Sequence, residues 1–338
     1  MNTAFSSILL QWFADNGREL PWRQTRNPYA IWLSEVILQQ TRVQQGMDYW
    51  YRFMKRFPTV DSLAAASEDE VMRLWQGLGY YARARHLHEA ARQIAGMGSF
   101  PDTYESILKL SGVGPYTAAA VAAFAFDRPV AAVDGNVYRV LARYFAIDTP
   151  INSTEGKKLF ASLAQELLPA SRAADFNQAM MDFGATQCTP QSPRCGDCPF
   201  AETCGALREG KVELLPVKLK TVKVQTRPLS YLIILYKEKI ALRRRSDEDI
   251  WKGLWEPVDL LHLPADYQAL ADKDGQWQLV AKGVKHILTH RRLIADFYLW
   301  QPQEELALPP GYQWIELCHL DDYGLPRLIE KVLKESVL

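Results

Sequence analysis

Four closely spaced cysteines form the clearest candidate site for chemistry in the sequence. They follow the pattern C-x6-C-x2-C-x5-C within 17 residues, at Cys188, Cys195, Cys198 and Cys204. The first residues show no basic segment or cleavage site of a secretory signal, so we expect these thiols to bind metal and not to form disulfides. Their chemistry suits either an iron–sulfur cluster or zinc. The fifth cysteine, Cys318, lies far off and is expected to be an ordinary thiol.

A carboxylate on an apolar helix face is the second candidate. Residues 27–40 are expected to form a helix that Asn27 caps. On this helix Glu35 lies inside an apolar arc formed by Ile31, Trp32 and Leu38. Burial raises the pKa of a carboxyl group, so Glu35 is a candidate general acid. The alternative is a solvated glutamate at the edge of the apolar stripe.

A second carboxylate, Asp134, stands directly before a predicted helix from Asn136 to about Ile147. In this position an aspartate commonly caps the helix by accepting hydrogen bonds from its first N–H groups. A capped helix start also holds a carboxylate still, so capping is compatible with a role in chemistry.

A glycine pair precedes a helix of small side chains. Gly112 and Gly114 flank Val113, so the backbone there is expected to take left-handed dihedral angles and to bring N–H groups close to a flat or anionic partner. Pro115 then begins a helix to about Phe126, whose N-terminus suits phosphate. The alternative is a tight turn between two helices.

A third segment, Gly77 to His88, combines two glycines, two tyrosines, two arginines and two histidines. These residue types provide a flexible turn, aromatic stacking surfaces and donors to phosphate. A buried tyrosine pair beside solvated arginines is the alternative. The segment follows a predicted helix from Ser67 to Trp75, with Ser67 as its cap.

The elements that must position these residues change type along the chain. Helical periodicity comes first, beginning with a face formed by Phe5, Ile8, Leu9, Trp12 and Phe13. It fades from about Arg208 to Pro228, a basic stretch that is expected to be a linker, either touching a polyanion or simply solvated. A separate α+β domain follows, with strand-like runs at 229–236, 240–244, 278–286, 293–300 and 313–317 and a helix at 321–333.

The composition is that of a globular chain with room for two domains: 338 residues, 48% hydrophobic and 23% charged. Lys+Arg and Asp+Glu are equal at 39 each, so nucleic-acid binding would need local patches. No run of 18 apolar residues occurs. We therefore expect no membrane association and a cytosolic location. A monomer is the default expectation.

Five motifs, read in order, resemble one family of enzymes. They are Trp32-Leu-Ser-Glu-Val-Ile-Leu-Gln-Gln-Thr, Gly77-Leu-Gly-Tyr-Tyr, Leu110-Ser-Gly-Val-Gly, Val133-Asp-Gly-Asn-Val and the four-cysteine loop. Over about residues 18 to 216 they closely resemble the MutY adenine DNA glycosylases of the helix-hairpin-helix superfamily, which also contains endonuclease III. The resemblance implies two helical lobes, one from about Pro28 to Val133 and the other formed by the N-terminal helix and the residues after Asn136. It further implies DNA across the cleft and a [4Fe–4S] cluster on the four cysteines.

The resemblance also implies catalytic roles. In such enzymes the target adenine is flipped out of the duplex. Glu35 would protonate adenine N7 as the general acid, and Asp134 would stabilise the oxocarbenium-like sugar. Asn136 and Tyr116 match supporting polar positions. Because Tyr116 stands where endonuclease III-like enzymes carry a nucleophilic lysine, we expect a monofunctional glycosylase.

Further matches concern DNA. The residues that wedge into the base stack match Gln40 and Tyr80, and the phosphate-binding hairpin matches Gly112, Val113 and Gly114. The adenine pocket matches Trp22, Arg23, Leu38 and Gln178.

The C-terminal domain resembles the MutT-like, Nudix-fold domain with which these enzymes recognise 8-oxoguanine opposite the adenine. Trp251-Lys-Gly-Leu-Trp-Glu-Pro fits that family's signature loop, but no Arg-Glu-x-x-Glu-Glu follows it. The metal-binding carboxylates of a Nudix hydrolase are therefore missing, and we expect recognition without pyrophosphatase activity. Residues 286–290 match the loop with which the family contacts 8-oxoguanine. Thr289 stands where family members often carry Ser, and His290 follows it.

The sequence thus predicts a mainly α catalytic region at 1–216 with the cluster loop at 188–204, a linker at 217–228 and a Nudix-like α+β domain at 229–338. The expected activity is that of a hydrolase, an adenine-specific DNA N-glycosylase acting on double-stranded DNA with adenine opposite 8-oxoguanine or guanine. The alternatives are an endonuclease III-like glycosylase/lyase for oxidised pyrimidines and a non-enzymatic DNA-binding protein. The expected location is cytoplasmic, nucleoid-associated and of bacterial type.

Overall fold

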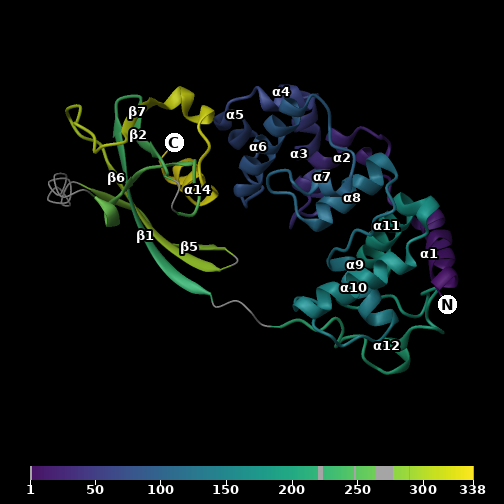
Figure 1. Cartoon of the computed structure of the whole chain (residues 1–338). Coiled ribbons are helices and arrows are strands. Elements are labelled where there is room, and N and C mark those ends of the chain that lie inside the picture. The colour runs from purple at the N-terminus through teal and green to yellow at the C-terminus, as the bar shows by residue number, and fades with distance from the viewer. Residues whose placement is uncertain (1, 220–223, 247–248, 264–276, 289, 338) are drawn as a thin grey trace. The chain divides into compact units, whose positions relative to one another are not determined.

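The computed structural model describes residues 2–219, 224–246, 249–263, 277–288 and 290–337 (Figure 1). The chain divides into two compact units, one of residues 1–61 and 89–220 and the other of residues 62–88 and 221–338. Within the described residues, no helix is both long and apolar enough to cross a membrane.

The described chain up to residue 219 is helical, as its periodicity predicts. In order, its longer elements are α1 (Asn2–Asn16), α2 (Pro28–Ile37), α3 (Val43–Arg56), α5 (Glu68–Leu74), α6 (Ala82–Met97), α8 (Pro115–Phe126), α9 (Gly135–Tyr144), α10 (Thr154–Leu167) and α11 (Ala173–Asp182). Shorter turns are the 3₁₀ helices η1 (Pro21–Arg23) and η2 (Ala170–Arg172), α4 (Val60–Ala64), α7 (Tyr104–Ile107), the π-helix η3 (Phe183–Gln187) and α12 (Gly205–Arg208).

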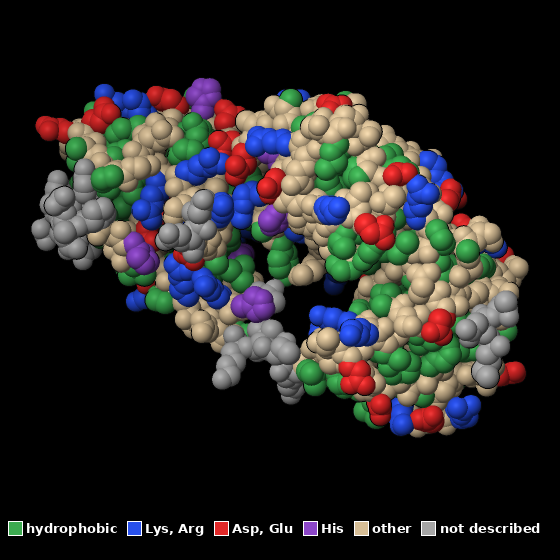
Figure 2. Space-filling model, in the orientation of Figure 1, with side chains coloured by type: hydrophobic (Ala, Val, Ile, Leu, Met, Phe, Trp, Pro, Cys, Tyr) green, Lys and Arg blue, Asp and Glu red, His purple; other side chains and the backbone are tan. Residues whose placement is uncertain are grey.

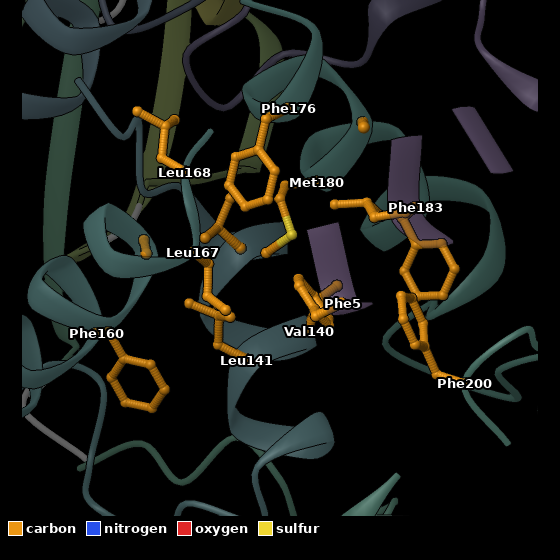
Figure 3. Packing of buried hydrophobic residues seen from close by; sticks show 14 of the residues in the cluster. Phe5, Val140, Leu141, Phe160, Leu167, Leu168, Phe176, Met180, Phe183 and Phe200 are labelled. Carbon is orange, nitrogen blue, oxygen red and sulfur yellow. The ribbon is translucent and has the colours of Figure 1, made fainter. Parts of the chain in front are cut away.

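One core of the first unit joins the start of the chain to helices far along it. Phe5 of α1 packs in one buried cluster with residues of α9, α10 and α11 (Figure 3), including Leu141, Phe160 and Met180. This confirms that the N-terminal helix joins the later helical lobe. The predicted face of α1 is wrong at one position, because Ile8 is exposed and Leu10 is buried in its place.

The helix that carries Glu35 begins as predicted but ends earlier. The Asn27 side chain accepts hydrogen bonds from the N–H groups of Tyr29 and Ala30, and Pro28 occupies the first turn. α2 stops at Ile37, and Gln40 takes a φ of +56°, which an α-helix does not accommodate. The side chain of Gln40 is therefore presented by a turn that follows the helix.

The described residues of the C-terminal part form a mixed sheet with a helix against it, as the strand-like runs predict. Its strands are β1 (Gln225–Tyr236), β2 (Lys239–Arg244), β3 (Trp255–Glu256), β4 (Val258–Asp259), β5 (Gln278–Ile287), β6 (Arg291–Trp300) and β7 (Tyr312–Glu316). The order is β3-β2-β1-β6-β5, with β4 on β1 and β7 on β2. β1 and β6 pair in parallel, and the remaining pairs are antiparallel.

The last helix, α14 (Arg327–Ser336), begins later than predicted because residues 317–322 form a 3₁₀ segment, η7, and Pro326 precedes the helix. It packs its apolar side on the sheet, where Ile329 joins Tyr231 and Phe297 in the core. An ion pair also joins the end of η7 to α5 of the same unit, where Arg73 Nη1 lies 2.8 Å from Asp322 Oδ1. On the face in Figure 2, basic, acidic and hydrophobic side chains are interspersed, in keeping with the balanced charge of the sequence.

Candidate active site

A cavity of about 1050 Å³ in the first unit collects residues from widely separated parts of the sequence. The four predicted catalytic residues line it, namely Glu35, Tyr116, Asp134 and Asn136. So do the predicted adenine-pocket residues Trp22, Arg23, Leu38 and Gln178, the wedge candidate Gln40 and the glycines Gly112 and Gly114. The cavity is at the upper end of the usual size of a ligand site.

Glu35 lies deep in this cavity, on the buried side of α2. Its exposed fraction is 7%, which confirms the prediction from the apolar arc. Burial raises the pKa of Glu35 to about 7, the nearby charge of Asp134 acts in the same direction, and a hydrogen bond from Tyr116 and the charge of Arg23 oppose it. A large share of this carboxyl group is therefore protonated at neutral pH, as a general acid requires.

Tyr116 contacts Glu35 directly from the first turn of α8. Its hydroxyl donates to Glu35 Oε2 at 2.7 Å and lies 3.7 Å from the Met181 sulfur. Burial and the two neighbouring carboxylates hold the pKa of the Tyr116 phenol well above its ordinary value. Tyr116 therefore stays a neutral hydrogen-bond donor to the acid.

Asp134 caps α9, as predicted, and points a carboxylate into the same cavity. Its Oδ1 accepts from the N–H groups of Asn136 and Val137, both at 2.8 Å, and its Oδ2 accepts from Asn136 Nδ2 at 2.7 Å. Three donors at a helix N-terminus form a setting that suits negative charge. The two carboxylates thus occupy contrasting surroundings, one apolar and one rich in donors.

Asn136 is itself held by residues that sequence reasoning missed. Arg139 Nη2 donates to Asn136 Oδ1 at 2.8 Å and to the Gly184 carbonyl at 2.6 Å. The π-turn η3 brings Gly184 so close that a Cβ atom there would lie 2.5 Å from Cβ of Asn136. Nothing in the sequence marks this contact, because it depends on the packing of η3 on α9.

Two more missed residues contact Arg23, namely Arg18, which also lines the cavity, and Asp182, which does not. Asp182 ends α11, is fully buried, and accepts hydrogen bonds from both arginines. The signal that picks out Glu35, an acid within an apolar helical stretch, is also present at Asp182, which follows Met180 and Met181.

The glycine hairpin meets the cavity through its backbone. Gly112 has a φ of +69°, as predicted, whereas Gly114 has an ordinary φ of −95° and serves as the N-cap residue of α8, so the left-handed prediction for Gly114 is wrong. No atom lies within 4 Å of where a Cβ on Gly114 would stand. The glycine therefore leaves open space at the helix N-terminus. The Val113 side chain is buried and anchors the turn.

Tyr80 belongs to the second unit and sits in a constrained turn between α5 and α6. Its side chain is 49% exposed, and its φ of +49° is unusual for a bulky residue. The indole of Trp75 donates to the Gly79 carbonyl at 3.0 Å, and the Arg83 guanidinium stacks 5.5 Å from the Tyr80 ring centre. These contacts present an aromatic ring to solvent from a well-defined backbone.

The four cysteines line one small cavity beside α9. Arg143 of that helix lies close, with Nη1 3.5 Å from Cys188 Sγ, and also donates to the Thr189 and Pro190 carbonyls. Among the described residues, no set of three or more His, Cys, Asp or Glu side chains is spaced to hold a single metal ion. Four thiols that line one cavity supply the thiolate ligands that an iron–sulfur cluster needs.

Within the described residues 249–263, the signature loop of the sheet domain shows no hydrolase-type carboxylate set. Glu256 of that loop is buried and pairs with Arg243 and Arg245, and the Tyr231 hydroxyl donates to it at 3.1 Å. His290 is exposed after the β5 strand. The predicted contact residue Thr289 lies outside the described residues.

Three family models match the sequence. Residues 33–169 match the HhH-GPD superfamily base excision DNA repair protein, and residues 230–335 match the NUDIX domain. Residues 188–204 match the iron-sulfur binding domain of endonuclease III. This match spans the four cysteines. It confirms the prediction of an iron–sulfur cluster over the alternative of zinc.

Curated adenine DNA glycosylases are similar to the chain. The mouse protein is 46% identical over 228 residues, covering 63% of this chain and 44% of that protein. The protein of Buchnera aphidicola subsp. Baizongia pistaciae is 38% identical over 257 residues, covering 74% of this chain and 72% of that protein. The match thus spans less than half the length of the mouse relative. A solved structure of a thermostable thymine-DNA glycosylase superposes with a TM-score of 0.58 at 32% identity, covering 62% of this chain and 97% of that one.

Proposed function

Because the chain belongs to the adenine DNA glycosylase family, we propose that it hydrolyses the N-glycosidic bond of adenine mispaired with 8-oxoguanine or guanine in double-stranded DNA. One observation carries the proposal for the chemistry. A buried carboxyl group with a pKa of about 7 and a carboxylate held by three N–H donors line the same cavity. Such contrasting environments are how one site supplies both an acid and a negative charge.

The first step is protonation of the base. The adenine leaves the stack and enters the cavity, where protonated Glu35 donates to adenine N7. The base then leaves as a neutral species when the bond to the sugar breaks. Trp22, Arg23, Leu38 and Gln178 line the cavity and form the proposed adenine pocket.

The second step concerns the sugar. Its oxocarbenium-like charge is stabilised or trapped by Asp134, and water then forms the new C1′–O bond while its proton returns to Glu35, which the first step left ionised. Asn136 donates to Asp134 Oδ2 and keeps that oxygen in place. Tyr116 offers a phenol and no amine, so no Schiff base forms and strand cleavage is weak or absent.

Recognition of the duplex is assigned to exposed features of the chain. The N–H groups of Gly112 and Gly114 bind phosphate, while that of Val113 donates to the Leu110 carbonyl at 3.1 Å and closes the turn. Gln40 and Tyr80 enter the base stack. Both wedge residues have positive φ values, a strain that is common at functional positions. The Nudix-like domain contacts 8-oxoguanine through Thr289 and His290.

The division of the chain follows from the same proposal. We assign residues 1–216 to catalysis, with the cluster loop at 188–204, residues 217–228 to a linker and residues 229–338 to recognition of the opposite base. The [4Fe–4S] cluster held by the four cysteines supplies a fixed centre for the loop that follows α11. We propose a monomer that acts on chromosomal DNA in a bacterial-type cytoplasm.

One assay tests the function. The protein is incubated with duplexes that carry adenine opposite 8-oxoguanine, adenine opposite guanine, or thymine glycol, and abasic sites are measured before and after alkali. We expect alkali-dependent breaks at both adenine mispairs and intact thymine glycol. Product at thymine glycol alone would point to an oxidised-pyrimidine glycosylase/lyase, and tight binding without product anywhere would point to a non-enzymatic DNA-binding protein.

A further inference from the structure

Asp182 is a fully buried carboxylate that two arginines share. Its oxygens accept from Arg18 Nε at 2.9 Å and Nη2 at 2.5 Å, from the Arg18 backbone N–H at 2.8 Å, and from Arg23 Nη1 and Nη2, both at 2.8 Å. One carboxylate with five charge-assisted or backbone donors is unlike an ordinary surface ion pair. The two guanidinium groups are therefore held in one geometry.

Arg23 links this group of ion pairs to Glu35, the proposed general acid. Its Nη1 also donates to the Arg18 carbonyl at 2.9 Å, its guanidinium lies 5.7 Å from the Phe13 ring centre, and its side chain is 13% exposed. Among the other charged side chains, Arg18, Arg26, Arg42 and Asp175 also line the cavity. The groups that act on the pKa of Glu35 through charge or hydrogen bonding are Tyr116 from α8, Asp134 from the start of α9, and Arg23 from η1. Arg23 is the cation among them.

The role of Asp182 follows from the net charge that it forms with Arg18 and Arg23. Arg18 and Arg23 both line the cavity, and Asp182 is buried beneath them, so the three residues leave one net positive charge at the cavity wall. A positive charge near a carboxyl group favours its ionised form and works against its use as a proton donor. Without Asp182, two uncompensated guanidinium groups would stand there.

Resting on the proposed function, we propose that Asp182 is a positioning residue that tunes the proton donor. It fixes Arg23 at the cavity wall and compensates half of the positive charge of the two arginines, so that Glu35 keeps a substantial protonated fraction at neutral pH.

The experiment is a charge series. Asp182→Asn raises the local charge to two, Arg18→Gln lowers it to zero, and the double variant restores one. The alkaline limb of single-turnover adenine release should move to lower pH by about half a unit or more in Asp182→Asn, to higher pH in Arg18→Gln, and back in the double variant. Asp182→Glu keeps the charge, so its limb should stay at the wild-type pH even where the maximal rate falls.

A direct titration separates this inference from the function. The titration midpoint of Glu35 is followed by ¹³C NMR of glutamate-labelled protein, with Glu35→Gln to assign the signal, and should move in the same directions. Midpoints that stay fixed across the series would overturn the tuning role and leave Asp182 a structural residue. If Asp182→Asn does not fold, the Arg18→Gln variant is enough for the test. An unchanged or lowered titration midpoint of Glu35 in that variant would overturn the tuning role. Wild-type protein that releases no adenine would refute the proposed function, while the titration would still judge Asp182.

Discussion

The hydroxyl of Tyr116 donates a 2.7 Å hydrogen bond to Oε2 of Glu35. The bond connects the first turn of α8, directly after the glycine hairpin, to the buried face of α2. The residue that we propose separates this chain from glycosylase/lyases with a nucleophilic lysine therefore touches the proposed acid itself. Hairpin, phenol and acid form one contiguous structure.

Replacing Glu35 by Gln should abolish adenine release while duplex binding persists. The amide keeps the shape of the side chain but has no acidic proton to give, and general acid catalysis contributes roughly 10²–10⁴-fold. Single-turnover base release and gel-shift binding measure the two properties. The matched control is Glu155→Gln, an exposed residue in the first turn of α10, which should leave the rate unchanged. Near-normal turnover in Glu35→Gln would remove Glu35 from the acid role.

The rate of base release should decline on the alkaline side with a midpoint near pH 7. Burial raises the pKa of Glu35 to about 7, and the protonated form is the one that donates. Well above the midpoint, each further pH unit should lower the rate about tenfold. A pH profile of the chemical step, from about pH 5 to 9, checks this. A flat profile over that range would argue against an acid of this pKa.

The same group should make stability depend on pH. The pKa of Glu35 is raised in the folded protein from 4.5 to about 7, so the folded state binds more protons between these values. This stabilisation is fully present below about pH 4.5 and is lost as the pH rises through 7. The difference is at most about 3 kcal/mol. Urea unfolding of wild type and Glu35→Gln at pH 5 and pH 8 should show the variant gaining relative stability at the higher pH. Equal differences at both pH values would contradict the shift.

Replacing Tyr116 by Phe should move the alkaline limb to higher pH. The hydrogen bond from Tyr116 lowers the pKa of Glu35, so its loss leaves the carboxyl group easier to protonate. The measurement is the pH profile of adenine release, compared with wild type under identical salt. A limb displaced to lower pH would show that the phenol acts in the opposite sense.

Replacing Gly184 by Ala should impair catalysis strongly. The new Cβ would lie 2.5 Å from Cβ of Asn136, and one of the two must move. Since Asn136 holds Asp134, we expect a loss of adenine release of tenfold or more, with duplex binding largely kept. Gly96→Ala is the control, because no atom lies within 4 Å of its Cβ position near the end of α6. That variant should be fully active and more stable by about 0.4–1 kcal/mol.

Replacing Cys198 by Ser should remove the cluster, whereas Cys318→Ser should keep it. Cys198 lines the shared cysteine cavity, and Cys318 is exposed elsewhere. Iron content and visible absorbance of the purified proteins distinguish the two. Thermal unfolding should show a lower midpoint for Cys198→Ser because the loop loses its fixed centre. Full iron content in that variant would exclude Cys198 as a ligand.

The sequence by itself was enough for several features that depend on spacing along the chain. Asn27 and Asp134 cap helices because a short polar side chain before a helix reaches its first N–H groups. Glu35 is buried because its neighbours at helical spacing are apolar. The four cysteines indicate a metal site because of their number and their close spacing in the sequence.

Tertiary structure decided what depends on distance between remote segments. Gly184 packs closely against Asn136, which is 48 residues away in the sequence. Asp182 binds Arg18 and Arg23, which are more than 150 residues away. Tyr116 donates to Glu35, which is 81 residues away. Helical periodicity says which side of a helix is buried, but not which partner meets it there. The pKa of Glu35, and with it the working pH of the proposed acid, is set by those partners and by the burial that the fold imposes.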